Sequence, residues 1–135
     1  MELTGGNMCF ACGQENPIGL KLDFIWEGKR YTTRFTPSSE HQGYDGILHG
    51  GIMTTILDEV MGRMFFVQGE QVMTAQLEVR FRQPVQTGEE LYFAAEVIED
   101  KGRVIQVQAT AYLSDGNVAA QAQGKFMRIR KGKKN

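Results

Sequence analysis

The stretch that decides the fold is HGGIMTTILDEVMGRMFFV, residues 49–67. Large apolar side chains recur there at helical spacing from Gly50 to about Val67 and cover most of the helix circumference, leaving only a thin polar side: Ile52, Met53, Ile56, Leu57, Val60, Met61, Met64 and Phe65. A helix that is apolar almost all round is buried rather than lying on a surface. The pattern therefore predicts one long helix with the rest of the protein packed around it.

Alternating apolar and polar residues on both sides of this helix predict β-strands. Strands are expected over 20–26 and 30–35 before the helix, and over 77–81, 91–98, 105–113 and 118–129 after it, with short polar turns between them. Pro84 ends the first strand after the helix, since proline cannot continue a sheet ladder. A sheet that curls around one central helix would suit both the helix and the one-sided strands. The expected class is α+β.

Length and charge limit the organisation of the chain and its partners. The 135 residues suffice for one domain, with little interior to spare for an enclosed cleft. We expect an arm over 1–19, a single domain over 20–130 and a basic tail over 131–135. Six of the 15 basic residues lie in the stretch 125–135, leaving nine against 16 acidic residues in the rest of the chain. An acidic body of this kind is unlike a nucleic-acid-binding domain.

The sequence shows no membrane or secretory segment. Its longest apolar runs fall far short of the ~18 residues of a membrane span, and residues 1–5 lack the basic and apolar regions of a secretory signal. We therefore expect a cytoplasmic protein whose partners include neither nucleic acid nor a membrane.

Two cysteines form a Cys-x-x-Cys pair, Cys9 and Cys12. Zinc would need two further ligands, and the histidines, His41 and His49, do not have the spacing of a compact zinc finger. Turn residues follow the pair, whereas a thioredoxin-like motif opens a helix. A reducing compartment also disfavours a structural disulfide. We expect no metal and no cofactor.

The polar side of the predicted helix carries the candidate chemistry. Glu59 can form an ion pair with Arg63 one turn later, but Asp58 has no cation three or four residues away. Aspartate is unfavourable in mid-helix, so Asp58 either has a tertiary or solvent partner or serves a function. Gly50 and Gly51 either form a tight turn or leave helix N-terminal amides open to a carbonyl oxygen that becomes negative. These amides lie ~10–12 Å along the axis from Asp58, so one helix cannot complete such a site.

The motif His49-Gly50-Gly51, with Asp58 nine residues after the histidine, resembles that of hotdog-fold acyl-CoA thioesterases of the PaaI-like type. The surrounding stretches agree, and the resemblance covers the chain up to its tail: GYDGILHGG at 43–51, TTILDE at 54–59, and MTAQLEVRF at 73–81 with Pro84. The segments CFACG at 9–13 and NPIGL at 16–20 resemble an opening that recurs in one branch of the family. The resemblance implies a hotdog fold, an antiparallel sheet of five to six strands wrapped around one long central helix.

The resemblance also implies a mechanism shared between two protomers of a homodimer or homotetramer. The Gly50 amide would polarise the carbonyl of an acyl-CoA thioester, while Asp58 of the partner would act as general base or nucleophile. Thr74 would hold the water or the carboxylate, and His49 would order the turn or the thioester end rather than act as the base.

Three further residues are expected to contact the substrate. Members often carry an amide side chain six residues before the histidine, where this chain has Gly43, and Gln42 lies one position away. We expect Gln42, Gly51 and Arg82 to bind substrate, Arg82 by meeting phosphate groups of CoA.

Two other functions stay open at this point. A hotdog dehydratase would pair His49 with Asp58 to act on hydroxyacyl thioesters. A non-catalytic module that binds acyl-CoA or another small ligand would account for the missing amide at Gly43. A serine hydrolase is disfavoured, because no serine of the chain lies in a nucleophile elbow.

Overall fold

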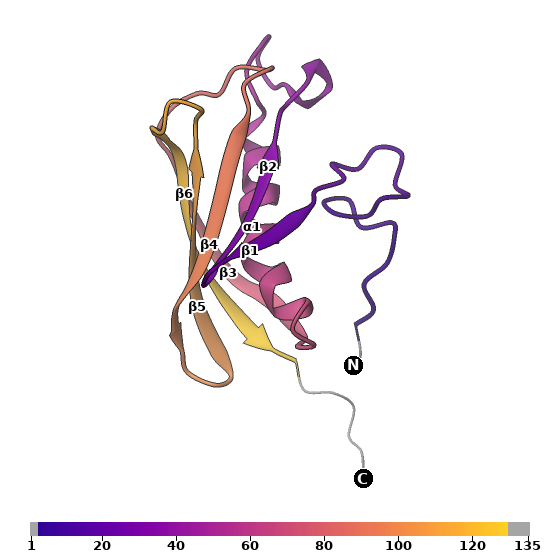
Figure 1. Ribbon diagram of the computed structural model, residues 1–135, viewed down its shortest axis with the longest axis vertical. Coiled ribbons are helices and arrows are strands. Elements are labelled where there is room, and N and C mark those ends of the chain that lie inside the picture. Colours follow the sequence, from indigo (N-terminus) through magenta and orange to yellow (C-terminus); the bar gives the residue numbers. More distant parts are fainter. Residues whose placement is uncertain (1–2, 130–135) are drawn as a thin grey trace.

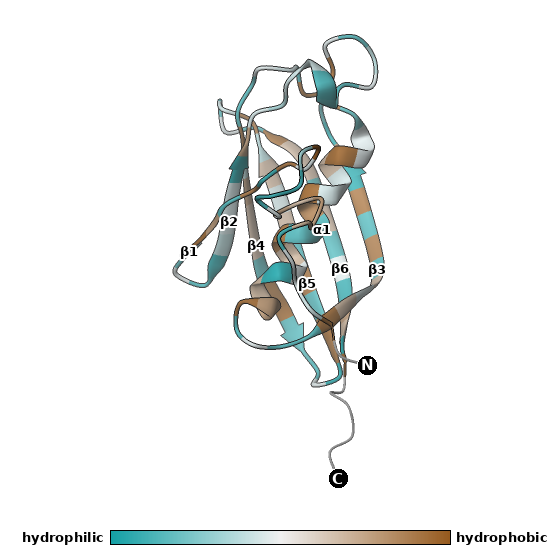
Figure 2. Cartoon of the chain, turned by 90° about the vertical axis from the view of Figure 1, so that its right-hand side faces the viewer, coloured by the Kyte–Doolittle hydropathy of each residue, from teal (hydrophilic) through white to brown (hydrophobic). Residues whose placement is uncertain are grey.

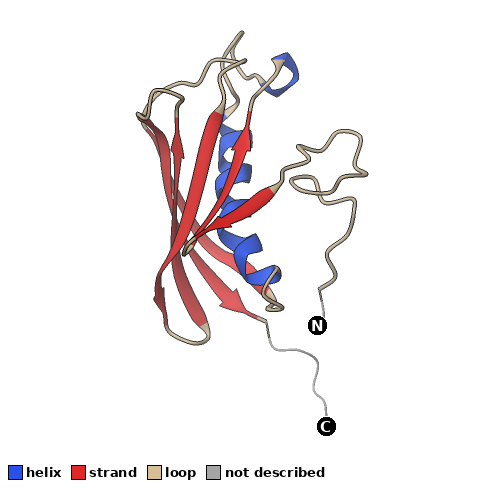
Figure 3. Ribbon diagram, viewed as in Figure 1, coloured by secondary structure: helices blue, strands red, loops and turns tan. Residues whose placement is uncertain are grey.

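The computed structural model describes residues 3–129, and the predicted tail over 131–135 lies outside them. Its elements are β1 (Phe24–Glu27), β2 (Arg30–Phe35), the short 3₁₀ helix η1 (Ser39–His41), α1 (Gly50–Phe66), β3 (Val72–Phe81), β4 (Leu91–Asp100), β5 (Val104–Tyr112) and β6 (Val118–Arg128). The strands form one antiparallel sheet in the order β1-β2-β4-β5-β6-β3. This sheet curves around α1 (Figures 1 and 3). The predicted α+β hotdog architecture is confirmed.

The core lies between α1 and the concave face of the sheet. Helix residues Ile56, Leu57 and Val60 are fully buried, and Phe93 and Val107 cover them from the sheet. Alternating apolar and polar residues are visible along β3 (Figure 2), as expected for strands that bury one face. No helix in the described part of the chain has the length and hydropathy that crossing a membrane requires.

The N-terminal arm covers the side of α1 that faces away from the sheet (Figures 1 and 2). The predicted strand over 20–26 begins only at Phe24. The amides of Leu20 and Leu22 donate instead to arm carbonyls, those of Phe10 and Ala11. Lys21 between them adopts a left-handed φ of 54°, which interrupts an extended strand. Helix α1 is therefore apolar almost all round because the sheet packs on one side of it and the arm on the other.

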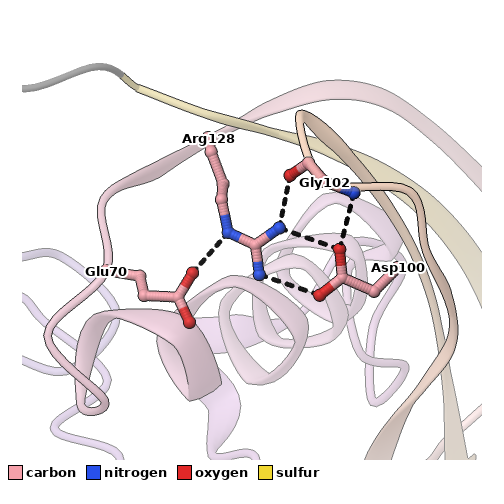
Figure 4. Close-up of polar contacts among 4 residues, drawn as sticks. All are labelled: Glu70, Asp100, Gly102 and Arg128. Carbon is pink, nitrogen blue, oxygen red and sulfur yellow. Dashed lines mark hydrogen bonds and ion pairs between the residues drawn. The ribbon is translucent and has the colours of Figure 1, made fainter.

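A polar network centred on Arg128, the last residue of β6, lies at one end of the sheet (Figure 4). Its guanidinium donates to both oxygens of Asp100, at 2.8 and 2.9 Å, and to the Gly102 carbonyl and Glu70. These bonds tie β6 to the β4–β5 turn and to the segment between α1 and β3. Arg128 is therefore committed to the fold and is not free to meet an anionic substrate.

Candidate active site

Asp58 finds its partner on β3. The Thr74 hydroxyl donates a hydrogen bond of 2.7 Å to Asp58 Oδ1. A β-bulge between Thr74 and Gln76 allows this contact, because its extra residue shifts which side chains of β3 point to each face of the sheet. Thr74 pairs with Phe126 and so lies on the helix-facing side of the sheet, although simple alternation would place it on the outer side with Gln76. Bulges re-aim side chains in this way and recur beside active sites.

The surroundings of Asp58 favour a carboxylate with raised basicity. Burial raises the pKa of Asp58 above its usual range, and the hydrogen bond from Thr74 lowers it by a smaller amount. Among the described residues, no cation pairs with Asp58. A desolvated carboxylate with a single neutral donor is suited to accepting a proton.

The helix N-terminus presents one free amide. His49 is the N-cap of α1, and its Nδ1 accepts a hydrogen bond of 2.8 Å from the Gly51 amide. The Gly51 amide is thus already used, which leaves Gly51 without the free donor expected for substrate binding. Within residues 3–129, no acceptor pairs with the amide of Gly50, which is exposed.

The loop before the helix is held by the amide side chain of Gln42. Its Oε1 accepts a hydrogen bond of 2.9 Å from the Gly46 amide. Gly43 lies against the imidazole, since a Cβ added there would come 3.4 Å from His49 Cδ2. Gln42 therefore braces the turn that presents His49, and its side-chain oxygen already accepts one hydrogen bond from that turn.

Four of the predicted site residues line two separate cavities. Gly50 and Arg82 line a cavity of about 220 Å³ at the start of the helix, together with Phe81. Asp58 and Thr74 line a different cavity, of about 780 Å³, between the arm and α1. One chain thus keeps the amide and the carboxylate apart, as the helix geometry predicts.

The larger cavity also contains a cluster that the sequence patterns did not reveal. Cys9 and Cys12 of the arm face Glu59 of α1, and the ligand atoms of the three side chains all lie within 4.8 Å of one another. The predicted ion pair between Glu59 and Arg63 is wrong, since it is not among the ion pairs of the described chain. Arg63 Nη1 instead donates to Cys12 Sγ at 3.4 Å. The sequence signal that could have indicated this cluster was the CFACG segment at 9–13, which contains both cysteines.

Both thiols of this cluster are free, and the Cys12 thiol is not an activated nucleophile. The structure contains no disulfide between Cys9 and Cys12. Burial, followed by the hydrogen bond and negative charge of Glu59, raises the pKa of the Cys12 thiol far above its ordinary value, while the charge of Arg63 opposes this shift. A thiolate nucleophile requires the opposite, a lowered pKa.

Residues 45–120 match the family model of the thioesterase superfamily. The chain belongs to this superfamily. The match includes the start of α1, Asp58 and Thr74, so the elements that carry the candidate site fall within the part shared with the family.

Relatives and solved structures agree with this assignment. Acyl-coenzyme A thioesterase THEM4 of Bos taurus is 27% identical over 123 residues, which is 89% of this chain and 51% of the relative. The chain thus spans about half the length of this curated relative. Protein RHA08564, a thioesterase superfamily protein, superposes with a TM-score of 0.80 at 27% identity, over 87% of this chain and 61% of that one.

The likeness to PaaI concerns the fold. The PaaI protein of E. coli, from the phenylacetic acid degradation operon, superposes with a TM-score of 0.76 at 19% identity, over 82% of this chain and 81% of that one. The resemblance deduced from the sequence is confirmed for the superfamily and for its hotdog fold.

Proposed function

We propose that this thioesterase-superfamily chain hydrolyses an acyl-CoA thioester to a free acid and CoA. The observation that carries the proposal is the 2.7 Å contact from Thr74 to the desolvated Asp58. The THEM4 relative, an acyl-coenzyme A thioesterase, supports the substrate class.

The reaction follows from the two half-sites. Asp58 takes a proton from a water held beside Thr74, and the resulting hydroxide attacks the thioester carbonyl. The oxyanion that forms accepts a hydrogen bond from the Gly50 amide at the positive end of the α1 dipole. Collapse of this intermediate expels CoA as its thiolate, which takes up the proton held by Asp58 and so restores the carboxylate. In the alternative version, Asp58 itself attacks the carbonyl and expels CoA as its thiolate, and water then hydrolyses the acyl-carboxylate anhydride to the free acid and the Asp58 carboxylate.

The two half-sites belong to different chains in this proposal. Strand β3 lies at an edge of the sheet, with β6 on one side only. Met73 and Phe81 on this edge are exposed at 47% and 56%, and an exposed apolar edge is suited to pairing with another chain. Such pairing would bring Gly50 of one protomer to the Asp58 of the other. A homodimer suffices, and a homotetramer would contain two such pairs.

The contacts of His49 disfavour the dehydratase. In neutral His49, the Nδ1 that accepts from Gly51 is unprotonated, so the proton lies on Nε2 and the ring has no free basic nitrogen. His49 thus fits an ordering role better than that of a base.

A complementation experiment tests the shared site. Asp58→Asn removes the base, which should lower kcat by about 10²–10⁴-fold. Gly50→Pro removes the amide hydrogen while suiting the first position of a helix, and His49 before it already has the extended conformation that proline requires. Gly50→Ala retains the amide and is the matched control.

The readout is release of free thiol from a panel of aliphatic and aryl acyl-CoAs. Each single variant should be almost inactive, whereas co-expressed Asp58→Asn and Gly50→Pro chains should recover about a quarter of wild-type activity. Half of randomly paired dimers are mixed, and each mixed dimer has one intact site. No recovery in verified mixed dimers would refute the shared site. Tight binding without thiol release by the wild-type protein would refute hydrolysis and favour the binding module.

A further inference from the structure

In the large cavity the arm lies against α1, and the side chains that face each other there take no part in the proposed hydrolysis. We propose that Cys9, Cys12 and Glu59 form a binding site for a zinc-like divalent cation that fastens the arm to the helix. The proposal is independent of thioester hydrolysis, since it rests on the cluster alone.

The distances suit tetrahedral zinc. Zn–S bonds of about 2.3 Å and Zn–O bonds of about 2.0–2.2 Å place a sulfur and an oxygen ligand about 3.5 Å apart, and two sulfurs about 3.8 Å apart. Cys9 Sγ and Glu59 Oε2 are 3.9 Å apart, and all three ligand atoms lie within 4.8 Å of one another. Closing the cluster onto a metal therefore requires side-chain movements of only about 1 Å. Two thiolates with one carboxylate favour zinc over magnesium or calcium.

The arm is built to present the two thiols. The Gly13 amide donates to the Cys9 carbonyl at 2.8 Å, and the Cys12 amide lies 3.5 Å from Cys9 Sγ. A Cβ at Gly13 would come within 2.3 Å of the Asn7 carbonyl oxygen, so the loop is too tightly wound for any other residue there. This tight loop fixes both sulfurs on the side that faces α1.

Arg63 supplies the matching charge. Two thiolates and one carboxylate around a divalent cation have a net charge of −1, and the adjacent guanidinium neutralises it. Arg63 Nη1 already donates to Cys12 Sγ at 3.4 Å, the kind of outer contact that orients a metal ligand. The Nε of Arg63 is buried without a partner among the described residues. The fourth coordination position would face the cavity and take a water molecule.

The sequence could not reveal this site. Cysteine and histidine spacing supplies only two ligands, and the third comes from α1, 47 residues after Cys12. The expectation of no metal rested on those spacings.

The test measures zinc and cobalt binding to the full chain, purified in a non-thiol reductant. Zinc should bind at one equivalent per chain with a dissociation constant below about 1 µM. Bound cobalt should give thiolate charge-transfer bands and the visible bands of tetrahedral coordination. Zinc should also slow hydrogen exchange in residues 7–20.

Variants assign the ligands. Cys9→Ser, Cys12→Ser and Glu59→Gln should each weaken binding by more than the roughly 10–100-fold that loss of an outer-shell partner costs. Glu78→Gln, on the exposed face of β3, is the matched control and should bind as the wild type does. Circular dichroism of each variant confirms that it is folded.

Three results would overturn the proposal. Binding weaker than about 1 µM in the wild type would exclude a dedicated site. Unchanged affinity in folded Glu59→Gln would exclude the third ligand. Cobalt spectra without thiolate bands would show that the metal binds elsewhere.

Discussion

The hydrogen bond between Thr74 and Asp58 allows the most direct test of the proposed chemistry. Thr74→Val removes the hydroxyl and keeps a β-branched side chain of similar shape, which suits a strand position. Because Thr74 is exposed on an edge strand, the fold should tolerate the change. Thr110→Val on the central strand β5 is a matched control, since Thr110 is not among the partners of Asp58.

The expected loss follows from the contact itself. A hydrogen bond to a charged group contributes about 1.5–3 kcal/mol. If the bond holds the carboxylate as it accepts the proton, its loss should lower kcat/KM by about 10- to 150-fold. Thr110→Val should leave kcat/KM unchanged.

The pH dependence gives a second and more specific readout. Activity requires the charged form of Asp58, so it should rise with pH through the pKa of this carboxyl. Burial raises that pKa and the Thr74 hydroxyl lowers it. Removing the hydroxyl leaves burial unopposed and raises the pKa further. The acidic limb of the kcat/KM profile should therefore move to higher pH in Thr74→Val.

The assay is thiol release over a range of pH, with the best substrate of the acyl-CoA panel. A lowered kcat/KM with the acidic limb in its wild-type position would refute the reasoning, because Thr74 would then act on the substrate and not through Asp58. A limb moved to lower pH would refute the assigned electrostatics.

Two further predictions concern the fold. Gly124→Ala should lower the free energy of unfolding by about 1–3 kcal/mol in urea titrations, because the new Cβ would lie 2.7 Å from Phe126 Cε1 and 3.3 Å from Met61 Cε; an unchanged urea midpoint would contradict this. Arg128→Met should lower the melting temperature near neutral pH. Arg128 lowers the pKa of Asp100 to about 2, against about 3.9 unfolded, so this stabilisation is present above pH ~4 and lost as pH falls towards 2. The difference in melting temperature between wild type and Arg128→Met should shrink over that range, and a constant difference would contradict the assignment.

Helix α1 could be predicted from the sequence almost to the residue, because its signal is local. The apolar pattern and the two glycines predicted a helix from Gly50 to about Val67, and the observed helix is Gly50–Phe66. Strands β2, β4, β5 and β6 were predicted to within two residues for the same reason, since each alternates buried and outer residues. The strands predicted over 20–26 and 77–81 were wrong in their first residues, because β1 begins at Phe24 and β3 at Val72. The segments that pack on the helix could not be predicted, because its apolar residues show that it is buried but not which parts of the chain bury it. The arm, with its left-handed Lys21, provides part of that cover through contacts between distant segments.

The candidate site could likewise be predicted from the sequence only in part. Asp58 could be identified because an aspartate among apolar residues has no local partner, and the resemblance to a known family added Thr74. The bulge that turns Thr74 towards Asp58 leaves no pattern in the sequence, because strict alternation would place that hydroxyl on the outer face of the sheet. The sequence also did not show that the Gly51 amide, predicted to bind substrate, donates to His49 Nδ1. A cap of this kind depends on side-chain rotamers that spacing does not reveal.

The geometry of α1 also explains why the proposed enzyme would need two chains. The free amide of Gly50 and the carboxylate of Asp58 are eight residues apart, about 12 Å along the axis, and they line different cavities. A reacting carbonyl must lie about 3 Å from its amide and close to the activated water, so a single helix cannot serve both. A lid would not shorten this distance, because both groups lie on one rigid element. Association of chains along β3 therefore supplies in this proposal what a small single domain lacks, a cleft enclosed on both sides.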